Sequence, residues 1–404
     1  MSQTTVGIVT TSRADWGHLR PVVREVSRSD RLTLRIYASG MHLSPEYGET
    51  VTMIERDGFE VDTRIEMLLS SDTPEGVAKS VGLGTSGFAQ EFGRDAPDLL
   101  MVLGDRYEIL AAVTAALAAR IPVAHIHGGE LSQGAIDDSV RHAVTKMSHL
   151  HFVSTDEYRR RVCQLGELPE RVHVSGAPGL DNVEDVEVMS FERLEETIGE
   201  PLGEGFLLVT YHPVTRTPEL TMGEVEALLE VLADTDRTKL FTQPNADSGG
   251  REVLEAVRAF VGSRDDAMMV DNLGTRAYFS AMSHAAAMIG NSSSGIIEAA
   301  SFGLPVVNIG RRQEGRVRGE NVVDVGSEAS SIRRGLDEAT EPGFRDQLEG
   351  SDNPYGDGKS AKRIVDVLEE LLGERSGGGS ELLDKGFYDI AFEPDGSTEG
   401  DTGL

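Results

Sequence analysis

The chain has 404 residues, enough for two domains of ordinary size, and its 39% hydrophobic and 26% charged residues are typical of a globular protein. Acidic residues number 68 and basic residues 38, so the formal charge is 38 − 68 = −30, which argues against nucleic acid and anionic membrane surfaces as partners. With one cysteine, Cys163, no internal disulfide can form. The first residues have no signal-peptide pattern and no apolar run could cross a bilayer, so we expect a cytoplasmic protein.

The basic residues are unevenly divided between the two types. Lysine occurs at only six positions, and arginine supplies the rest. An acidic, lysine-poor surface resembles that of proteins from salt-accumulating halophiles, and the alternative is an acidic enzyme from a mesophile.

Apolar runs alternate with helical segments in the first half of the chain. Strands are expected at 6–11, 32–38, 98–103, 121–127 and 149–154, and helices near 17–26, 45–57, 74–92, 109–119 and 140–147. This alternation predicts a parallel sheet with helices on both faces, in which ligands bind beyond the carboxyl ends of the strands. The first strand is not followed by GxGxxG, so the sequence does not favour a dinucleotide site.

Titratable residues follow several of these expected strand ends. Asp105, His127, Glu130 and Asp137 all lie at or just beyond one. Their shared location predicts that they form one site. Arg13 follows the first strand, where it is either a phosphate ligand or a surface arginine near a helix start.

A second series of strands and helices begins after an acidic, irregular segment. Strands are expected at 206–211, 239–242, 267–270, 285–289, 306–309 and 321–325, and helices near 220–234, 251–261, 275–283, 296–302 and 360–372. We therefore expect an α/β protein with a first domain at 1–177, a second at 178–375 whose last helix could pack back on the first, and a flexible acidic tail at 376–404 that begins with SGGGS.

The stretch 285–312 has the order strand, small polar loop, helix, strand, arginine pair. Its loop contains Ser292, Ser293 and Ser294, whose hydroxyls would stand beside free backbone N–H groups at a helix start. Arg312 could add a bidentate grip on phosphate, and Glu298 could accept hydrogen bonds from ribose hydroxyls. The alternative is an ordinary serine N-cap in a βαβ unit.

Two domains of this kind would place a nucleotide diphosphate opposite the carboxylates of the first domain. Paired carboxylates suit a reaction in which one group removes a proton and another donates one. His212, at a strand end of the second domain, could stabilise a departing phosphate. His125 and His127 share one face of a strand and, with Glu130 and Asp137 nearby, could form a metal site; the alternative for His125 is a satisfied interior histidine.

Several long motifs resemble one known family, the hydrolysing UDP-N-acetylglucosamine 2-epimerases. They are GDRYE (104–108), HIHGGE (125–130), AIDDSVRHAVTKMSH (135–149), YHPVT (211–215), PNADSGG (244–250), GNSSSGIIEA (290–299) and GRRQEGRVRGENV (310–322). The resemblance extends from residue 6 to about 372. It implies two Rossmann-like domains of the GT-B type with a cleft between them, and a UDP-sugar substrate. It also implies elimination of UDP to a glycal, then hydration to N-acetylmannosamine, with no metal or cofactor.

The resemblance also implies roles for individual residues. Asp105 and Asp137 match carboxylates that transfer protons, and His212 matches the residue that stabilises the leaving UDP. The residues expected to bind substrate are Arg13, Arg106, Ser292, Ser293, Ser294, Glu298 and Arg312. Many relatives have a catalytic Glu where this chain has His127, so the third acid/base is either His127 or Glu130.

Alternatives to this function remain open at the level of sequence. A sister branch acts on UDP-N,N′-diacetylbacillosamine, and LLSSDTPEG (68–76) resembles it at least as well. Non-hydrolysing epimerases have HVEAG where this chain has HIHGG. A GT-B glycosyltransferase would not need the aspartate cluster, and a non-catalytic nucleotide-sugar sensor could lose it. We expect a homodimer or homotetramer.

Overall fold

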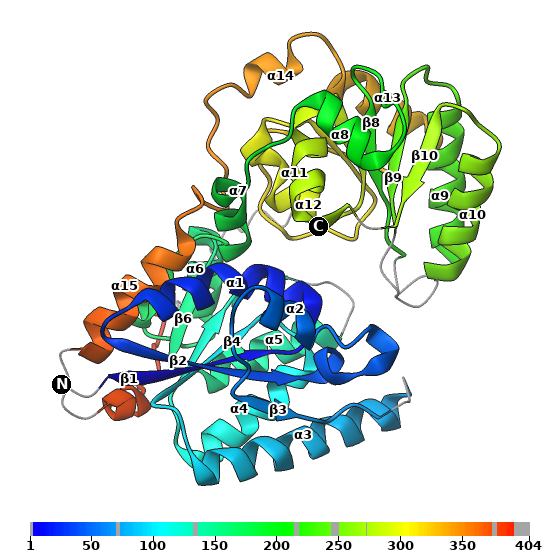
Figure 1. Ribbon diagram of the computed structural model, residues 1–404. Coiled ribbons are helices and arrows are strands. Elements are labelled where there is room, and N and C mark those ends of the chain that lie inside the picture. The colour runs from blue at the N-terminus through cyan, green and yellow to red at the C-terminus, as the bar shows by residue number, and fades with distance from the viewer. Residues whose placement is uncertain are drawn as a thin grey trace.

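Two parallel β-sheets, each flanked by helices, form the two halves of the protein in the computed structural model (Figure 1). The structure describes residues 3–69, 73–131, 136–213, 218–243, 250–271, 273–373 and 378–391. Figure 1 shows one sheet below and the other above, with α7 where the chain passes between them. None of the helices in these ranges has the length and apolar character that a membrane-spanning helix requires.

The first sheet has seven strands in the order β3-β2-β1-β4-β5-β6-β7, and all of its neighbouring pairs are parallel. The strands are β1 (Thr4–Thr10), β2 (Leu32–Ser39), β3 (Thr63–Ile65), β4 (Leu99–Leu103), β5 (Val123–Ile126), β6 (Leu150–Val153) and β7 (Val172–Val174). All five residues of β4 are buried, because helices cover both faces of the sheet.

The helices of this half divide between the two faces. They are α1 (Arg13–Arg28), α2 (Val51–Arg56), α3 (Pro74–Arg94), α4 (Tyr107–Ala119), α5 (Ile136–Met147) and α6 (Asp156–Gln164), with 3-10 turns η1 (Gly40–Leu43), η2 (Pro45–Tyr47) and η3 (Pro169–Arg171). Ile8 and Met101 pack in a core with α1, whereas Val9 and Val102 pack in a core with α3 and α4. This alternation follows from the two-residue period of a strand.

The second sheet has six strands in the order β10-β9-β8-β11-β12-β13, again with every neighbouring pair parallel. They are β8 (Leu207–Thr210), β9 (Lys239–Thr242), β10 (Ala267–Val270), β11 (Ala287–Gly290), β12 (Val306–Ile309) and β13 (Val322–Val325). Its helical elements are α8 (Phe191–Ile198), α9 (Pro218–Ala233), α10 (Gly250–Gly262), α11 (Gly274–His284), α12 (Ser293–Ile297), η5 (Ala299–Phe302), α13 (Ala329–Ala339) and α14 (Phe344–Gln347).

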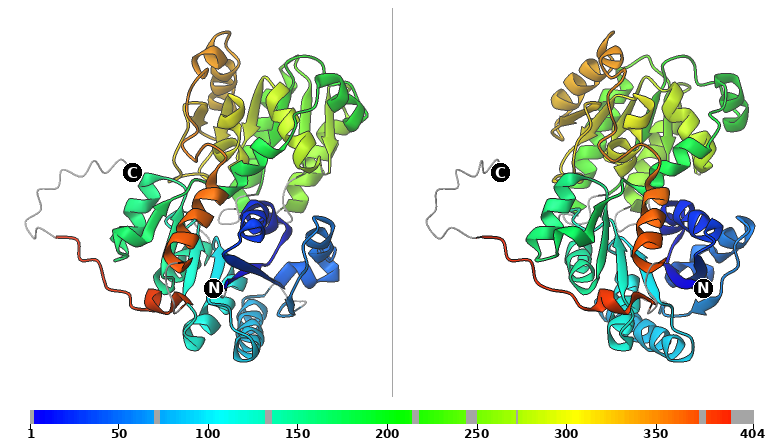
Figure 2. Two further views of the ribbon diagram at one scale, coloured as in Figure 1. Left: turned by 60° about the vertical axis from the view of Figure 1, so that its left-hand side comes forward. Right: turned by 90° about the vertical axis from the view of Figure 1, so that its left-hand side faces the viewer.

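The chain returns to the first half through its last long helix, α15 (Ser360–Gly373). The apolar face of α15 packs on α1 through Ile364 and Leu368, and Figure 2 shows the two helices side by side in both views. Asp181 caps α15 by accepting hydrogen bonds from the backbone N–H groups of Ser360 and Ala361, at 2.9 and 2.7 Å. The outgoing and returning chain segments are thereby joined.

The division of the chain at residue 178 remains a prediction. The segments that follow it, η4 (Pro178–Leu180) and α7 (Asp181–Asp185), contact α1 of the first half. Asn182 accepts a hydrogen bond from Arg20 and donates one to the backbone carbonyl of Gly17, each at 2.8 Å.

Part of the tail that we expected to be flexible lies against the first half of the protein. It includes η6 (Gly378–Leu383), and Leu382 is buried in the core that α1 and α15 share. Lys385 lies 2.9 Å from the buried carboxylate of Glu167 and donates to the backbone carbonyl of Lys146 at 2.7 Å. This part of the tail therefore contacts the first half through a buried leucine and an ion pair.

Candidate functional site

Arg141, on α5, joins two of the loops that follow strands of the first sheet, those after β4 and β5. Its side chain is only 4% exposed. Its guanidinium donates to a carboxylate oxygen of Asp105 and, at 2.9 Å, to the backbone carbonyl of His127. Nη1 also lies 3.7 Å from Oε2 of Glu130. The structure therefore brings Asp105, His127 and Glu130 together at the carboxyl edge of the sheet, where sequence reasoning predicted them.

His127 and Glu130 form a buried hydrogen-bonded pair. Nδ1 of His127 lies 2.6 Å from Oε1 of Glu130, and the hydroxyl of Ser154 lies 3.0 Å from the same nitrogen. Burial would raise the pKa of Glu130, but the charges of His127, Arg316 and Arg141 and the hydrogen bond from His127 lower it below its usual value. Because an ionised carboxylate can only accept hydrogen bonds, Nδ1–H of His127 is the donor.

The backbone of His127 is left-handed, with φ = 64°, which is unusual for a residue other than glycine. It directly follows β5, and its carbonyl accepts the hydrogen bond from Arg141. A residue held in this region costs free energy that its surroundings must offset, and such residues concentrate at functional sites.

Asp137 lies in the first turn of α5, one helical turn before Arg141. Burial and the negative charge of Asp105 raise the pKa of Asp137 to about 6, although Arg106 and Arg141 act in the opposite direction. A carboxyl group with this pKa can bind or release a proton close to neutral pH.

Arg106 pairs with Glu108, and its side chain is 34% exposed. It donates to Oε1 of Glu108 at 2.6 Å, and Sδ of Met41 lies 3.1 Å from the same nitrogen. Glu108 is fully buried, and that burial raises its pKa against the effect of Arg106. Arg13 is the first residue of α1, and its side chain is exposed at the carboxyl edge of β1.

In the second half, Asn291 connects the loops after β8, β11 and β12. Its side-chain amide accepts from the backbone N–H of His212 at 2.7 Å and donates to the His212 carbonyl at 2.8 Å. Its backbone carbonyl accepts from Arg312 at 3.0 Å and from Gln313 at 2.9 Å. Burial and the charge of Arg312 lower the pKa of His212 to about 3, so its imidazole is neutral at pH 7.

The serine loop leads directly into α12 and to Glu298. Ser292 is the N-cap, and its hydroxyl accepts from the backbone N–H of Ser294 at 3.3 Å, so the ordinary capping role is present. Ser293 is the first residue of α12. Burial raises the pKa of Glu298 to about 7, and its buried Oε2 has no hydrogen-bond partner among the described residues. An orphaned buried acceptor at this place fits a ligand that brings hydroxyl donors.

Sequence reasoning missed three residues that connect this arrangement: Arg141, Asn291 and Arg316. The spacing of Arg141 from Asp137, four residues on one helix, could have placed both on the same face. Asn291 follows the end of β11 directly, but the sequence gives no sign of its hydrogen bonds, and it gives no sign of the contact of Arg316 with Glu130.

His125 is a satisfied interior histidine, as one of the two interpretations of the sequence predicted. Its Nε2 lies 2.7 Å from the carbonyl of Gly104 and its Nδ1 lies 3.1 Å from the hydroxyl of Thr145. Both ring nitrogens are thus engaged within the protein, so His125 does not join His127 as a metal ligand. In the described part of the chain, no group of three or more His, Cys, Asp or Glu residues is placed to hold a metal ion.

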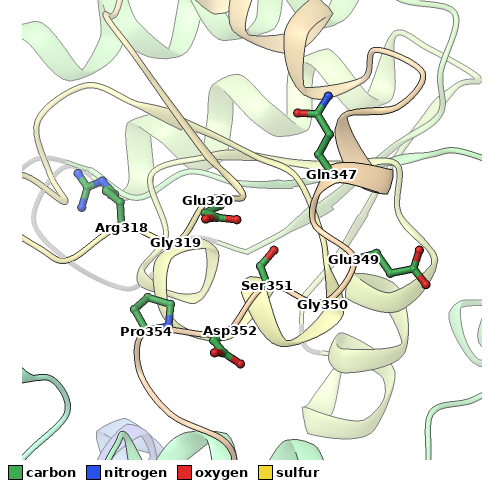
Figure 3. Close-up of a pocket in the computed structure, with 9 residues that line it drawn as sticks. All are labelled: Arg318, Gly319, Glu320, Gln347, Glu349, Gly350, Ser351, Asp352 and Pro354. Carbon is green, nitrogen blue, oxygen red and sulfur yellow. The ribbon is translucent and has the colours of Figure 1, made fainter.

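The surface also has a pocket of about 500 Å³ that contains none of the predicted site residues (Figure 3). Its lining includes Glu320, Glu349 and Asp352, whose negative charges oppose a diphosphate. The arrangement of charged groups at the strand ends, and not this hollow, is therefore the candidate site.

A family model described as UDP-N-acetylglucosamine 2-epimerase matches residues 24–369. The chain belongs to this family. A GDP/UDP-N,N′-diacetylbacillosamine 2-epimerase (hydrolyzing) of Campylobacter jejuni is 40% identical over 326 residues, covering 80% of this chain and 85% of the relative. A UDP-N,N′-diacetylbacillosamine 2-epimerase (hydrolyzing) of Legionella pneumophila is 36% identical over 363 residues, covering 90% and 95%. A UDP-N-acetylglucosamine 2-epimerase of Neisseria meningitidis serogroup B is 30% identical over 366 residues, covering 89% and 93%.

Solved structures of the UDP-N-acetylglucosamine 2-epimerase family have the same fold. One from Neisseria meningitidis bound to UDP-GlcNAc aligns with a TM-score of 0.78 at 18% identity, over 91% of this chain and 100% of the other. A putative member from Listeria monocytogenes gives 0.76 at 16% identity, over 97% and 100%. The predictions of the family and of two Rossmann-like domains of the GT-B type are confirmed.

The raised pKa of Asp137 predicts how this epimerase-family protein responds to pH. The folded-state pKa of about 6 lies above the ordinary value of 3.8, so the folded protein holds this proton more tightly than the unfolded chain. The resulting stability is fully present below pH 3.8 and is lost as the pH rises through 6. Asp137→Asn lacks this titration. Its unfolding free energy minus that of wild type should therefore be about 1 kcal/mol higher at pH 8 than at pH 5.

Urea denaturation of both proteins at the two pH values measures this difference. Asp156→Asn is the matched control, because Asp156 occupies the first turn of α6 but is exposed. An Asp137→Asn effect that is equal at pH 5 and pH 8 would contradict the elevated pKa.

Proposed function

We propose that this protein is a hydrolysing UDP-N,N′-diacetylbacillosamine 2-epimerase, which forms UDP and the diacetamido analogue of N-acetylmannosamine. The observation that carries this choice of sugar is the 36–40% identity, over 80–90% of the chain, to two relatives named as hydrolysing 2-epimerases of N,N′-diacetylbacillosamine, one linked to UDP and the other to GDP or UDP. Sequence reasoning placed UDP-N-acetylglucosamine first and this sugar second. Relatives named for UDP-N-acetylglucosamine are less similar, at 22–30% identity, so the comparisons favour the second choice.

The reaction proposed breaks two bonds of the sugar and forms two others. Loss of the C2 proton and of UDP from C1 leaves a C1–C2 double bond. Water then supplies the hydroxyl at C1 and a proton returns to C2 from the opposite face, which inverts that carbon. Only protons, water and a leaving group move, so two acid/base groups and a diphosphate site suffice.

The first half of the protein would supply the acid/base groups. Asp137 is suited to proton transfer by its pKa of about 6, and Asp105 lies close enough to raise that value. His127 presents a further basic nitrogen, because Nδ1 is occupied by Glu130 and Nε2 is the other ring nitrogen. We propose that Asp105, Asp137 and His127 together exchange protons with the two faces of the sugar at C1 and C2, with no single face assigned to any of the three.

The second half would bind UDP. Arg312 and the serine loop would bind the diphosphate, and Glu298 would accept hydrogen bonds from the ribose through its orphaned Oε2. His212 is neutral and buried, and an arriving diphosphate would stabilise its protonated form, so it can assist departure of UDP. Arg13 and Arg106 would approach the substrate from the first half, Arg106 after partial release from Glu108.

Offering both UDP-sugars to the purified protein tests the choice of substrate. We expect kcat/KM for UDP-N,N′-diacetylbacillosamine to exceed that for UDP-N-acetylglucosamine by at least about tenfold, the discrimination that roughly 1.4 kcal/mol provides. The free sugar and UDP are separated and quantified by chromatography. Preference for UDP-N-acetylglucosamine would restore the first sequence-based choice, and transfer of the sugar to an added acceptor would indicate a glycosyltransferase.

Arg312→Ala tests the diphosphate site by binding alone. Removing a charged hydrogen-bond partner should weaken UDP binding by roughly 1.5–3 kcal/mol. Isothermal titration with UDP measures the loss, and Arg311→Ala is the matched control because the Arg311 side chain is 84% exposed and pairs with Glu314. Equal UDP affinity in Arg312→Ala and wild type would remove Arg312 from the site.

A further inference from the structure

One segment of the second half reaches across to the acid/base groups of the first. This segment, residues 310–320, contains Arg312. Four residues after it, the guanidinium of Arg316 faces Glu130. Nη2 of Arg316 lies 3.6 Å from Oε2 of Glu130, and the Arg316 side chain is 16% exposed. The same short segment therefore contacts both parts of the candidate site.

The position of Arg316 is fixed by contacts on both sides of it. The backbone N–H of Val317 donates to the hydroxyl of Tyr158 at 3.2 Å, and the Val317 carbonyl accepts from Tyr355 at 3.1 Å. Gly315 has φ = 79° and packs so closely on Leu131 that a Cβ there would lie 2.8 Å from its Cδ1. Tyr158 and Leu131 belong to the first half of the chain, so these contacts seat the segment against it.

Glu130 is the group on which the two halves converge. Its Oε2 faces Arg141 at 3.7 Å from the first half and Arg316 at 3.6 Å from the second. Its Oε1 accepts from Nδ1–H of His127 at 2.6 Å. A buried carboxylate needs positive neighbours to remain ionised, and an ionised Glu130 holds the His127 proton on Nδ1.

We propose that Arg316 is a positioning residue that offsets part of the charge of Glu130, so that Glu130 orients the ring through Nδ1–H while Nε2 of His127 remains an unprotonated acceptor as long as the second half is seated on the first. This proposal rests on the proposed function and makes His127, not Glu130, the third acid/base. Glu130 is then the group that orients the imidazole. One segment of chain would then carry both Arg312, which binds the nucleotide, and Arg316, which keeps Nε2 of His127 able to accept a proton.

Other charged and titratable groups face this pair from the elements packed around it. From α1 come His18, whose ring centroid lies 5.9 Å from that of His127, and Asp15. Asp105, Tyr158 and Tyr355 also interact electrostatically with Arg316. All of them stay unchanged in the variants below, so the shifts compared report on Arg316 and Glu130.

The test measures the titration of the His127 ring by NMR, with His127→Gln used to assign the signal. Arg316→Met removes a positive charge and should raise the pKa of His127 by about one unit, while Glu130→Gln removes a negative charge and should lower it. Arg316→Lys should restore the wild-type titration. Arg311→Met, on the same segment but exposed, should leave titration and activity unchanged.

The kinetic readout separates positioning from binding. In Arg316→Met the acidic limb of kcat/KM should move up by about one pH unit, so that activity at pH 6 falls about tenfold, with UDP affinity within about twofold of wild type. Shifts of His127 in the same direction in Arg316→Met and Glu130→Gln would indicate general disruption and overturn the proposal, as would no shift in Arg316→Met. Opposite shifts in a protein inactive on both sugars would support the positioning role and overturn the proposed activity.

Discussion

The arrangement of the site depends on the charge of one buried carboxylate, Glu130. Its side chain is 4% exposed, and such a group remains ionised only when its charge is balanced nearby. The balance comes from Arg141 on α5 and from Arg316 in the second half of the protein, and Nδ1–H of His127 adds a hydrogen bond. Removing one partner would leave an uncompensated buried charge, so the loops that carry these groups are held in one arrangement.

In the second half the loops are connected by Asn291, whose side chain is neutral, whereas Glu130 in the first half is charged. Asn291 uses its side-chain amide to fix the backbone at His212 and its own carbonyl to hold Arg312 and Gln313. Three strand ends are thereby set relative to one another before any ligand binds. Prearranged donors and acceptors of this kind reduce the cost of binding, because less of the site must be ordered by the ligand.

Much of this could be predicted from the sequence, because strand–helix alternation is a local pattern and ligand sites follow strand ends. Asp105, His127 and Asp137 were placed correctly on that basis. The three-residue strands β3 and β7 were not predicted, since runs so short carry no periodicity. The ion pairs of Arg316 with Glu130 and of Lys385 with Glu167 join residues far apart in the chain, so neither could be predicted from local sequence.

The most direct test of the account is the origin of the proton at C2 of the product. If UDP is eliminated before water adds, the proton lost from C2 is replaced from solvent. The reaction run in D2O should therefore release free UDP and a C2-inverted sugar with one deuterium at C2, seen by NMR and mass spectrometry. Free sugar that keeps the original C2 hydrogen would contradict elimination, and inverted sugar still attached to UDP would contradict the hydrolytic step.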